Sequence, residues 1–340
     1  MTAVAAAGNA TRPTETMLAA VRTRWGAPED VVELKRVPKP ELGDDQVLVR
    51  VRATSINRGD YYSVTAPMIL LRPMMGGFLR PKSELIGGDF SGVVESVGKD
   101  MTDFAPGDEV FGSRNGAFAE YVAARMVAHK PPNVTFEEAA AVAGSALTAL
   151  QAIRDHGRLQ PGQSVLVNGA SGAVGTFAVQ MAKALGAGNV TAVCTTRNVE
   201  QARALGADNV VDYTKEDFTA SGERYDLIVD NVSSKSWRKI RRVLAPNGTL
   251  VMVGAQANRN PLIGPLGKVL RRRFVSRFTS QDAVFFIAKF NRPDMEVLRE
   301  LLESGKIKPA IERVYPFAQI AEALGVMGEG HARAKLVVTL

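Results

Sequence analysis

The chain has 340 residues, of which 46% are hydrophobic and 23% charged, and its formal net charge is +7 at pH 7. This length predicts two domains, each with a sizeable core of its own. The single cysteine, Cys194, excludes a disulfide framework and a zinc site built on cysteines. No apolar run approaches the roughly 20 residues that span a bilayer. We therefore expect a globular protein of the reducing cytoplasm.

The positive charge gathers in two places, residues 238–242 and 268–273. A pI near 9.5 makes nucleic acid the first partner to consider. Neither cluster lies in a nucleic-acid-binding motif or is interleaved with aromatic residues, so we interpret both as solvated basic faces and expect no nucleic-acid partner. Residues 1–16 are rich in Ala and Thr and lack the basic start and apolar core of a signal peptide, which predicts a disordered tail.

Residues 17–132 read as an all-β segment. Residues 47–53 alternate apolar and polar, as a half-buried strand does. Further short strands, with glycine or Pro-Gly turns beside them, are expected within 90–98, 103–112 and 116–122. Many short strands separated by such turns predict a small β-barrel.

The pattern changes after this segment. Residues 136–155 predict an alanine-rich helix, and from residue 164 apolar strands alternate with helices. The expected strands are 165–167, 190–194, 209–212, 225–230 and 249–254, and the helices between them are 174–184, 200–205 and 237–244. This alternation predicts a doubly wound parallel sheet. Helices at 294–304 and 320–327 and a strand at 334–339 close the chain, and we expect that strand to return to the barrel.

The stretch from Ser164 to Ala184 reads as a strand, a turn of small residues and a helix, which is the first unit of a dinucleotide-binding fold. A pyrophosphate lies against the first turn of such a helix, where free N–H groups and the positive end of the dipole point at it. Gly172 lets the backbone approach the phosphates, and Gly175 lets helix and strand pack closely. Ala170 replaces the first glycine of the usual pattern.

The end of the second strand indicates which dinucleotide binds. An NAD site places an acid there to bind the ribose 2′-hydroxyl, but residues 194–198 read Cys-Thr-Thr-Arg-Asn. Thr195 and Arg197 suit the 2′-phosphate of NADP instead, because arginine pairs with phosphate through two parallel bonds. The alternative is a polar loop with a surface arginine. Tyr213 and Lys215, just beyond the third strand, could flank the same phosphate, although Lys215 is more simply a surface charge.

Seven motifs extend these observations over residues 17–340: SINRGDYY (55–62), IGGDFSGVV (86–94), APGDEVF (105–111), GSALTA (144–149), GASGAVG (169–175), LGAD (205–208) and GHARAKL (330–336). With them the chain resembles the medium-chain dehydrogenase/reductase superfamily, and within it the zinc-free quinone oxidoreductase branch with zeta-crystallin and the enone reductases. The resemblance implies an α/β protein with a GroES-like β-barrel catalytic domain, residues 17–138 and 291–340, and a Rossmann NADP-binding domain, residues 139–290.

The zinc-dependent members carry a cysteine early in the barrel, a Gly-His-Glu segment and a lobe of four cysteines. Here Asn57 and its neighbours stand at the early position, Gly87-Gly-Asp89 replaces Gly-His-Glu, and the four-cysteine lobe is missing. We therefore expect no catalytic zinc.

The resemblance also implies roles for single residues. The implied cofactor contacts are Ser171, Gly172, Ala173 and Val174 for the pyrophosphate, Thr195, Arg197 and Tyr213 for the 2′-phosphate region, and Thr148, Asn231, Val253, Gly254 and Lys335 along the rest of the cofactor. Asn57 and Tyr62 match an Asn and a Tyr that face the nicotinamide and the substrate. Three alternatives stay open: Thr148 as a satisfied helix hydroxyl, Asn57 as the cap of a turn, and Tyr62 as a core residue. Tyr61 competes with Tyr62.

Reduction of an electrophilic acceptor suits this residue set. Without a metal or a nearby histidine, no strong Lewis acid or base is available for an alcohol. A quinone or activated alkene needs only orientation, a dry pocket and donors to the developing oxyanion. We therefore predict NADPH-dependent reduction of such an apolar acceptor. The alternatives are a zinc-free alcohol dehydrogenase, an enoyl reductase, or a catalytically idle NADP-binding accessory protein.

Two segments remain outside this account. Residues 66–80 are apolar and rich in methionine, and residues 260–278 combine leucines with basic side chains. They could wall an apolar substrate mouth, which we favour, touch a membrane as a peripheral basic surface, or form a subunit contact. Residues 282–288 read as a strand that pairs across a dimer in the resembled branch, so we expect a homodimer.

Overall fold

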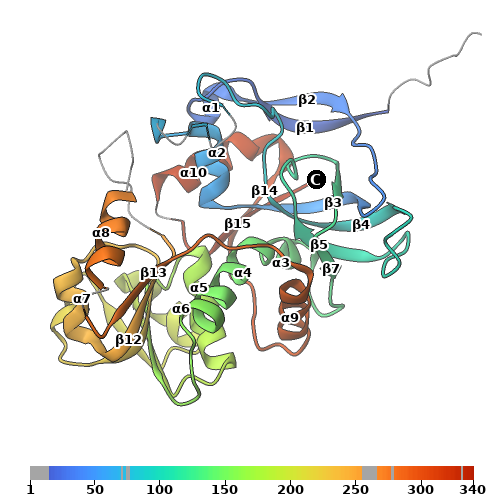
Figure 1. Cartoon of the computed structure of the whole chain (residues 1–340). Coiled ribbons are helices and arrows are strands. Elements are labelled where there is room, and N and C mark those ends of the chain that lie inside the picture. Colours follow the sequence, from blue (N-terminus) through green and yellow to red (C-terminus); the bar gives the residue numbers. More distant parts are fainter. Residues whose placement is uncertain (1–14, 70–71, 74–76, 255–265, 277–278, 331) are drawn as a thin grey trace, which may run out of the picture.

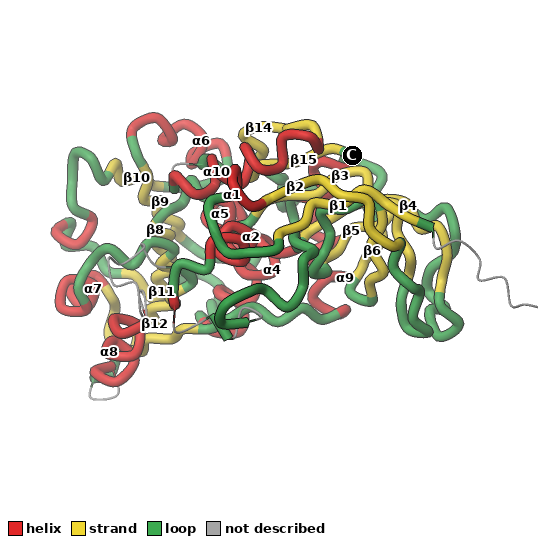
Figure 2. Tube along the Cα trace, turned by 90° about the horizontal axis from the view of Figure 1, so that it is seen from above, coloured by secondary structure: helices red, strands yellow, loops and turns green. Residues whose placement is uncertain are grey.

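The computed structural model describes residues 15–69, 72–73, 77–254, 266–276, 279–330 and 332–340. Its strands form a seven-stranded sheet, a six-stranded sheet and a two-stranded ribbon. Figure 2 shows the six-stranded sheet and the two-stranded ribbon at opposite ends of the molecule. Helices α2 (Arg58–Thr65), α4 (Ala143–Gln151) and α5 (Ala173–Ala184) lie between them (Figure 2). The α/β class is confirmed. The tail expected at residues 1–16 lies almost wholly outside the described residues.

The seven-stranded sheet contains the expected barrel strands. Its order is β14-β15-β3-β4-β5-β7, and β6 also pairs with β3. The strands are β3 (Val47–Ile56), β4 (Asp89–Val97), β5 (Glu109–Ser113), β6 (Tyr121–Ala124), β7 (Val127–His129), β14 (Ile311–Pro316) and β15 (Lys335–Thr339), and the ribbon is β1 (Thr16–Arg22) with β2 (Val32–Pro38). The strand expected at 116–122 starts only at Tyr121.

The all-β prediction for residues 17–132 is wrong in one respect, because two short helices interrupt the strands. They are α1 (Pro28–Val31) and α2 (Arg58–Thr65). Asn57 is the N-cap residue of α2, and its backbone N–H donates to the Asp60 carboxylate at 2.7 Å. Asn57-x-x-Asp60 is thus a local helix start, which alternation of apolar residues does not reveal.

The six-stranded sheet is parallel, with the order β10-β9-β8-β11-β12-β13. Its strands are β8 (Ser164–Asn168), β9 (Asn189–Cys194), β10 (Asn209–Asp212), β11 (Tyr225–Asp230), β12 (Leu244–Met252) and β13 (Asp282–Phe285), with helices α5 (Ala173–Ala184), α6 (Val199–Ala204), α7 (Trp237–Val243) and α8 (Leu266–Ser276). The Rossmann-like prediction is confirmed. β12 begins at Leu244, directly after α7, and not at residue 249.

The single helix predicted over 136–155 is three segments: α3 (Phe136–Ala140), α4 (Ala143–Gln151) and a π-helix at Ala152–His156. The π-helix closes with the Gly157 N–H donating to the Ala152 carbonyl at 2.8 Å. α3 packs on β3 and β4, so the domain limit predicted at residues 138–139 falls within a helix that covers the seven-stranded sheet.

The chain returns to the seven-stranded sheet at its end. After α9 (Arg292–Glu303) come β14, α10 (Ile320–Glu329) and β15. β15 pairs parallel with β14 and antiparallel with β3, so it lies inside its sheet (Figure 1). The expected return of the last strand to the barrel is confirmed. No helix in the described ranges is long and apolar enough to cross a membrane.

Candidate active site

The turn after β8 has the geometry expected of a pyrophosphate site. Gly172, in an extended conformation (φ −79°, ψ 172°), is the N-cap of α5, and no described side chain caps the helix. The first N–H groups of α5 therefore stay available to an anion. Ser171, Gly172, Ala173 and Val174 are all partly exposed. A Cβ on Gly175 would lie 2.1 Å from the Gly169 carbonyl oxygen, which is the close packing predicted for that position.

The residues predicted for the adenosine phosphate follow neighbouring strands. Thr195 and Arg197 come directly after β9, and Tyr213 directly after β10, which pairs with β9. The Tyr213 N–H donates to the Cys194 carbonyl at 3.0 Å, which holds the two loops together. Arg197 is exposed and Tyr213 is 56% exposed. The structure thus gathers the three residues at one edge of the sheet.

An acid also lies at this edge, and sequence reasoning did not weigh it. Asp212 ends β10, and its carboxylate accepts hydroxyl hydrogen bonds from Thr196 and from Thr214 (2.7 Å). These hydrogen bonds lower the pKa of the Asp212 carboxyl to about 2. Because both carboxylate oxygens already have hydroxyl partners, Asp212 does not stand as the free acid that an NAD ribose requires.

The residues that follow β11 and β12 include an unmatched acceptor. The Asn231 amide donates to the Asn168 carbonyl at 3.1 Å, while its buried Oδ1 has no hydrogen-bond partner in the described part of the chain. The Val253 N–H donates to the Asp230 carbonyl at 3.1 Å, and a Cβ on Gly254 would lie 2.4 Å from the Asn231 carbonyl oxygen. A buried acceptor without a donor costs free energy unless a ligand satisfies it. These residues therefore fit a nicotinamide nucleotide.

A buried polar cluster adjoins the turn on the side of the seven-stranded sheet. Lys335 is fully buried, and its ammonium donates to Asn57 Oδ1 at 2.7 Å and to Ser145 Oγ at 3.4 Å. Ser145 Oγ donates to the same Asn57 oxygen at 3.2 Å. Asp89 Oδ2 lies 3.6 Å from the ammonium and accepts from Asn57 Nδ2 and the Gly144 N–H, both at 2.9 Å.

Burial shapes the charges of this cluster. Burial lowers the pKa of the Lys335 ammonium, while Asp89 and Asp60 oppose that shift. Burial raises the pKa of the Asp60 carboxyl to about 7, and the negative charge of Asp89 adds to this rise. The hydrogen bond that Asp60 accepts from the Asn57 backbone N–H lowers the same pKa and offsets part of the rise. Asp60 is therefore partly protonated at neutral pH, and Lys335 and Asp89 form the cluster's main ion pair.

One backbone contact joins this cluster to the cofactor turn. The Ala334 N–H donates to the Ser171 carbonyl at 2.7 Å, and Gly172 and Ala334 form an isolated parallel bridge. The residue next along the chain is Lys335, whose ammonium points to Asn57 and not to open space at the turn. The contacts of Lys335 thus lie within the cluster, and its role as a cofactor contact stays a prediction.

The structure also bears on the alternatives for Thr148 and the tyrosines. Thr148 Oγ1 donates to the Gly144 carbonyl at 2.7 Å, so this hydroxyl is satisfied within α4, although the residue is partly exposed beside Gly144. Tyr61 packs against Gly328 of α10, where a Cβ would lie 2.4 Å from its ring. Tyr62 is half-buried, and its ring lies 6.0 Å from that of Tyr61. Tyr62 thus remains the better candidate to face a substrate.

The donor set beside Asn57 does not fit zinc. In the described ranges no three His, Cys, Asp or Glu side chains gather to hold a metal ion. A fully buried ammonium, that of Lys335, lies among the oxygens of Asn57, Ser145 and Asp89. A divalent cation there would meet a positive charge in place of a thiolate or imidazole ligand.

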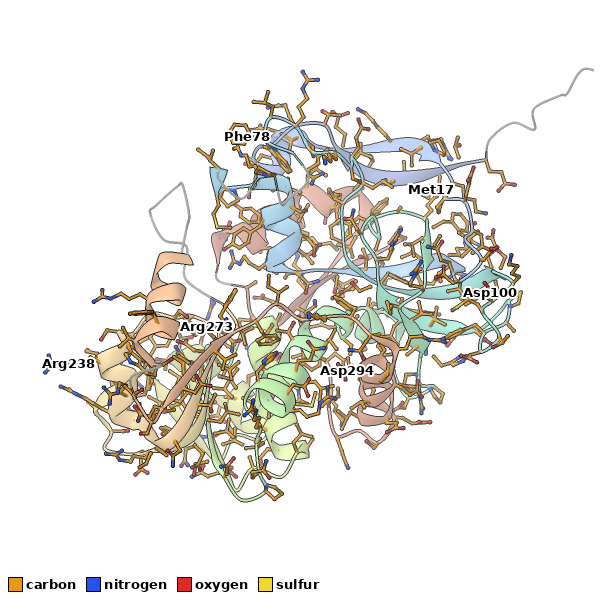
Figure 3. All side chains as sticks on the ribbon, viewed as in Figure 1. Met17, Phe78, Asp100, Arg238, Arg273 and Asp294 are labelled. Carbon is orange, nitrogen blue, oxygen red and sulfur yellow. The ribbon has the colours of Figure 1, made fainter. Side chains whose placement is uncertain are left out.

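The two unusual segments are described in part. Phe78 is 51% and Leu79 81% exposed, so the end of segment 66–80 presents apolar side chains to solvent. In α8, Arg271 and Arg273 are exposed and Arg272 is buried. Figure 3 shows Arg273 and Arg238 at the same end of the molecule, on α8 and α7. Residues 70–71, 74–76, 255–265 and 277–278 of these surroundings lie outside the described part.

Comparison with known protein families matches two separate regions of the chain to two domain models. Residues 43–133 match the model of the alcohol dehydrogenase GroES-like domain, and residues 205–338 match that of the zinc-binding dehydrogenases. Mouse mitochondrial NAD(P)H oxidoreductase RTN4IP1 is 34% identical over 87% of this chain and 82% of its own length. The chloroplastic quinone-oxidoreductase QR1 of Triphysaria versicolor is 31% identical over 89% and 92%.

A solved structure agrees with these relatives. The quinone oxidoreductase from Coxiella burnetii superposes with a TM-score of 0.83 at 28% identity, covering 96% of this chain and 100% of that one. Fold and sequence similarity therefore extend over both sheets and over the loops that carry the site.

Proposed function

Since the chain belongs to the medium-chain dehydrogenase/reductase superfamily, we propose that it is an NADPH-dependent reductase of quinones or activated alkenes. It is an oxidoreductase that uses a nicotinamide cofactor; the choice of NADPH and the acceptor are the proposal. The observation that supports it best is the hydrogen bond from the Ala334 N–H to the Ser171 carbonyl, because Ala334 is next to Lys335, whose ammonium contacts Asn57.

A bound NADPH would supply a hydride. Ser171 to Val174 would hold its pyrophosphate on the N–H groups of α5, and the Asn231 Oδ1 would accept from its carboxamide. Asn57 and Tyr62 would donate to the oxygen on which charge develops in the acceptor, and preorganised donors of this kind stabilise such charge strongly in a dry site. The acceptor then takes a proton from the Tyr62 hydroxyl or from water.

The relatives support both acceptor classes. QR1 is named a quinone-oxidoreductase, and a tomato relative that is 29% identical over 91% of this chain is named 2-methylene-furan-3-one reductase. A quinone and a conjugated enone both accept hydride at carbon while charge moves to oxygen, so one donor arrangement serves both. Steady NADPH oxidation with 1,4-naphthoquinone, an enone or an enoyl thioester ranks the acceptors, and no oxidation with any of them would favour an idle accessory protein.

The preference for NADPH depends on Arg197. Arg197→Ala should raise KM for NADPH by about 10- to 100-fold, the effect of losing a charge-assisted hydrogen bond, and change KM for NADH little. Lys215→Ala is the matched control, because Lys215 is a cation at the same edge, 3.6 Å from Asp212; we expect little effect on either cofactor. Equal effects of Arg197→Ala on both cofactors would remove the 2′-phosphate assignment.

Oligomeric state and location remain proposals. β13 ends the order of the six-stranded sheet, so its outer edge can pair with a second copy about a twofold axis. We propose a homodimer, and a monomer mass in sedimentation equilibrium would exclude it. The expected cytoplasmic location stays a prediction, because the names of RTN4IP1 and QR1 place those relatives in mitochondria and chloroplasts.

A further inference from the structure

The amide of Asn57 is held in one orientation by charged groups on both sides. Its Oδ1 accepts from the Lys335 ammonium at 2.7 Å and from Ser145 at 3.2 Å. Its Nδ2 donates to Asp89 at 2.9 Å. Turning the amide over would set its NH₂ group against an ammonium and its carbonyl against a carboxylate, so both contacts would become repulsive.

This orientation decides what Asn57 can offer a ligand. The carbonyl oxygen already has two donors, and one of the two amide hydrogens is given to Asp89. The Asn57 side chain also interacts with the Asp60 carboxyl, whose pKa this contact lowers, and Asn57 is only half-buried. Asn57 can therefore act toward the acceptor as a hydrogen-bond donor and not as an acceptor. A donor is what an oxyanion needs.

We infer that Lys335 is a positioning residue that fixes Asn57 as a hydrogen-bond donor for the acceptor oxygen. This inference rests on the proposed function and assigns Lys335 a task other than cofactor binding. Three observations favour it: the ammonium is fully buried, its shortest contact is Asn57, and Asp89 binds the ammonium and the Asn57 amide through one oxygen. The pair Lys335–Asp89 thus acts on the reaction only through Asn57.

The test is a double-mutant cycle in kcat with Asn57→Ala, Lys335→Met and the two combined. Asn57→Ala should lower kcat by about 100-fold, the loss expected for one oxyanion donor, and Lys335→Met should lower it by less, because Asp89 still holds the Asn57 amide from the other side. The combined variant should lie within about threefold of Asn57→Ala, because residues that act as a unit are not additive. KM for NADPH should change little in all three. If Lys335 had a merely structural role, the fold-loss in kcat of the combined variant would equal the product of the fold-losses of the two single variants.

Lys335→Met leaves the Asp89 carboxylate buried without its cation and could fail to fold. Lys335→Met with Asp89→Asn removes both charges and keeps the cluster neutral, and urea unfolding checks that it folds. This variant should lose at least as much kcat as Lys335→Met, since nothing then fixes the amide, and adding Asn57→Ala to it should bring kcat no lower than that of Asn57→Ala.

Two results overturn the inference alone. Multiplicative losses in kcat would show that Lys335 acts independently of Asn57, and a rise in KM for NADPH at unchanged kcat would return Lys335 to cofactor binding. A wild-type protein that reduces no quinone, enone or enoyl thioester would instead refute the proposed function, and the inference with it.

Discussion

Arg272 provides a sharp test of how α8 is fixed to the cofactor edge of the sheet. Its guanidinium lies 3.6 Å from Asp230 Oδ2, and it also donates to the carbonyls of Ser233 (3.4 Å) and Lys235. Asp230 is fully buried and is the last residue of β11, directly before Asn231. Its Oδ1 accepts from the Asn168 amide at 2.8 Å, but Oδ2 has no hydrogen bond in the described chain.

Arg272→Met keeps the length of the side chain and removes its charge. The Asp230 carboxylate is then buried without a cation, which costs about 3–5 kcal/mol when one partner of a buried pair is removed. The double variant with Asp230→Asn should cost less than the sum of the two single changes, with a coupling of about 1–3 kcal/mol. Arg271→Met is the matched control: this neighbouring arginine is exposed, and we expect a change within about 0.5 kcal/mol.

Urea unfolding, followed by tryptophan fluorescence, measures these differences in the free energy of unfolding. The comparison requires that this free energy depends on urea concentration with the same slope in every variant. Equal costs for Arg272→Met and Arg271→Met would refute the buried ion pair. Additive costs of Arg272→Met and Asp230→Asn would show instead that the guanidinium serves only the two carbonyls.

Two further substitutions test packing and charge near the site. Gly175→Ala sets a Cβ 2.1 Å from the Gly169 carbonyl oxygen, so we expect a loss of about 2 kcal/mol or more in the free energy of unfolding. Gly325→Ala, whose Cβ meets nothing within 4 Å, should lose nothing, and similar values for the two variants would contradict the packing. Burial raises the pKa of Asp60 to about 7, so the folded protein keeps this proton to a higher pH than the unfolded chain, and stability falls as pH rises from about 4 to about 7. Asp60→Asn cannot ionise and should gain up to about 3 kcal/mol relative to wild type between pH 5 and pH 8; a constant difference in urea unfolding at the two pH values would contradict the raised pKa.

Much of the fold follows from local patterns. The parallel strands are short apolar runs between turn residues, and the phosphate turn has small residues at fixed spacing, so both could be predicted. The break between α3 and α4 could not, because residues 139–143 are Ala-Ala-Ala-Val-Ala, with neither glycine nor proline to mark it. The start of α2 does carry a signal, the Asn57-x-x-Asp60 spacing, but a pattern of alternating apolar residues does not reveal it.

The candidate site was predicted less completely than the fold. The cofactor residues follow strand ends, and a parallel sheet brings strand ends together. Asp89 and Ser145 were present only within family motifs, and Asp60 was not singled out. Their importance lies in contacts such as that of Lys335 with Asn57, which are 278 residues apart in the chain. No spacing rule connects such positions, and only the antiparallel pairing of β15 with β3 brings them together.

The place of β15 has a consequence for biosynthesis. The six-stranded sheet is built from one continuous stretch, residues 164–285, and can close while the ribosome is still at work. The other sheet cannot, because β3 leaves the ribosome early and must wait for β15, the last strand to emerge. Until then the carboxylates of Asp60 and Asp89 lack their cation. The parallel sheet that carries the phosphate turn can therefore pair before Lys335 reaches Asn57, so the polar cluster around Asn57 forms later than the turn beside it.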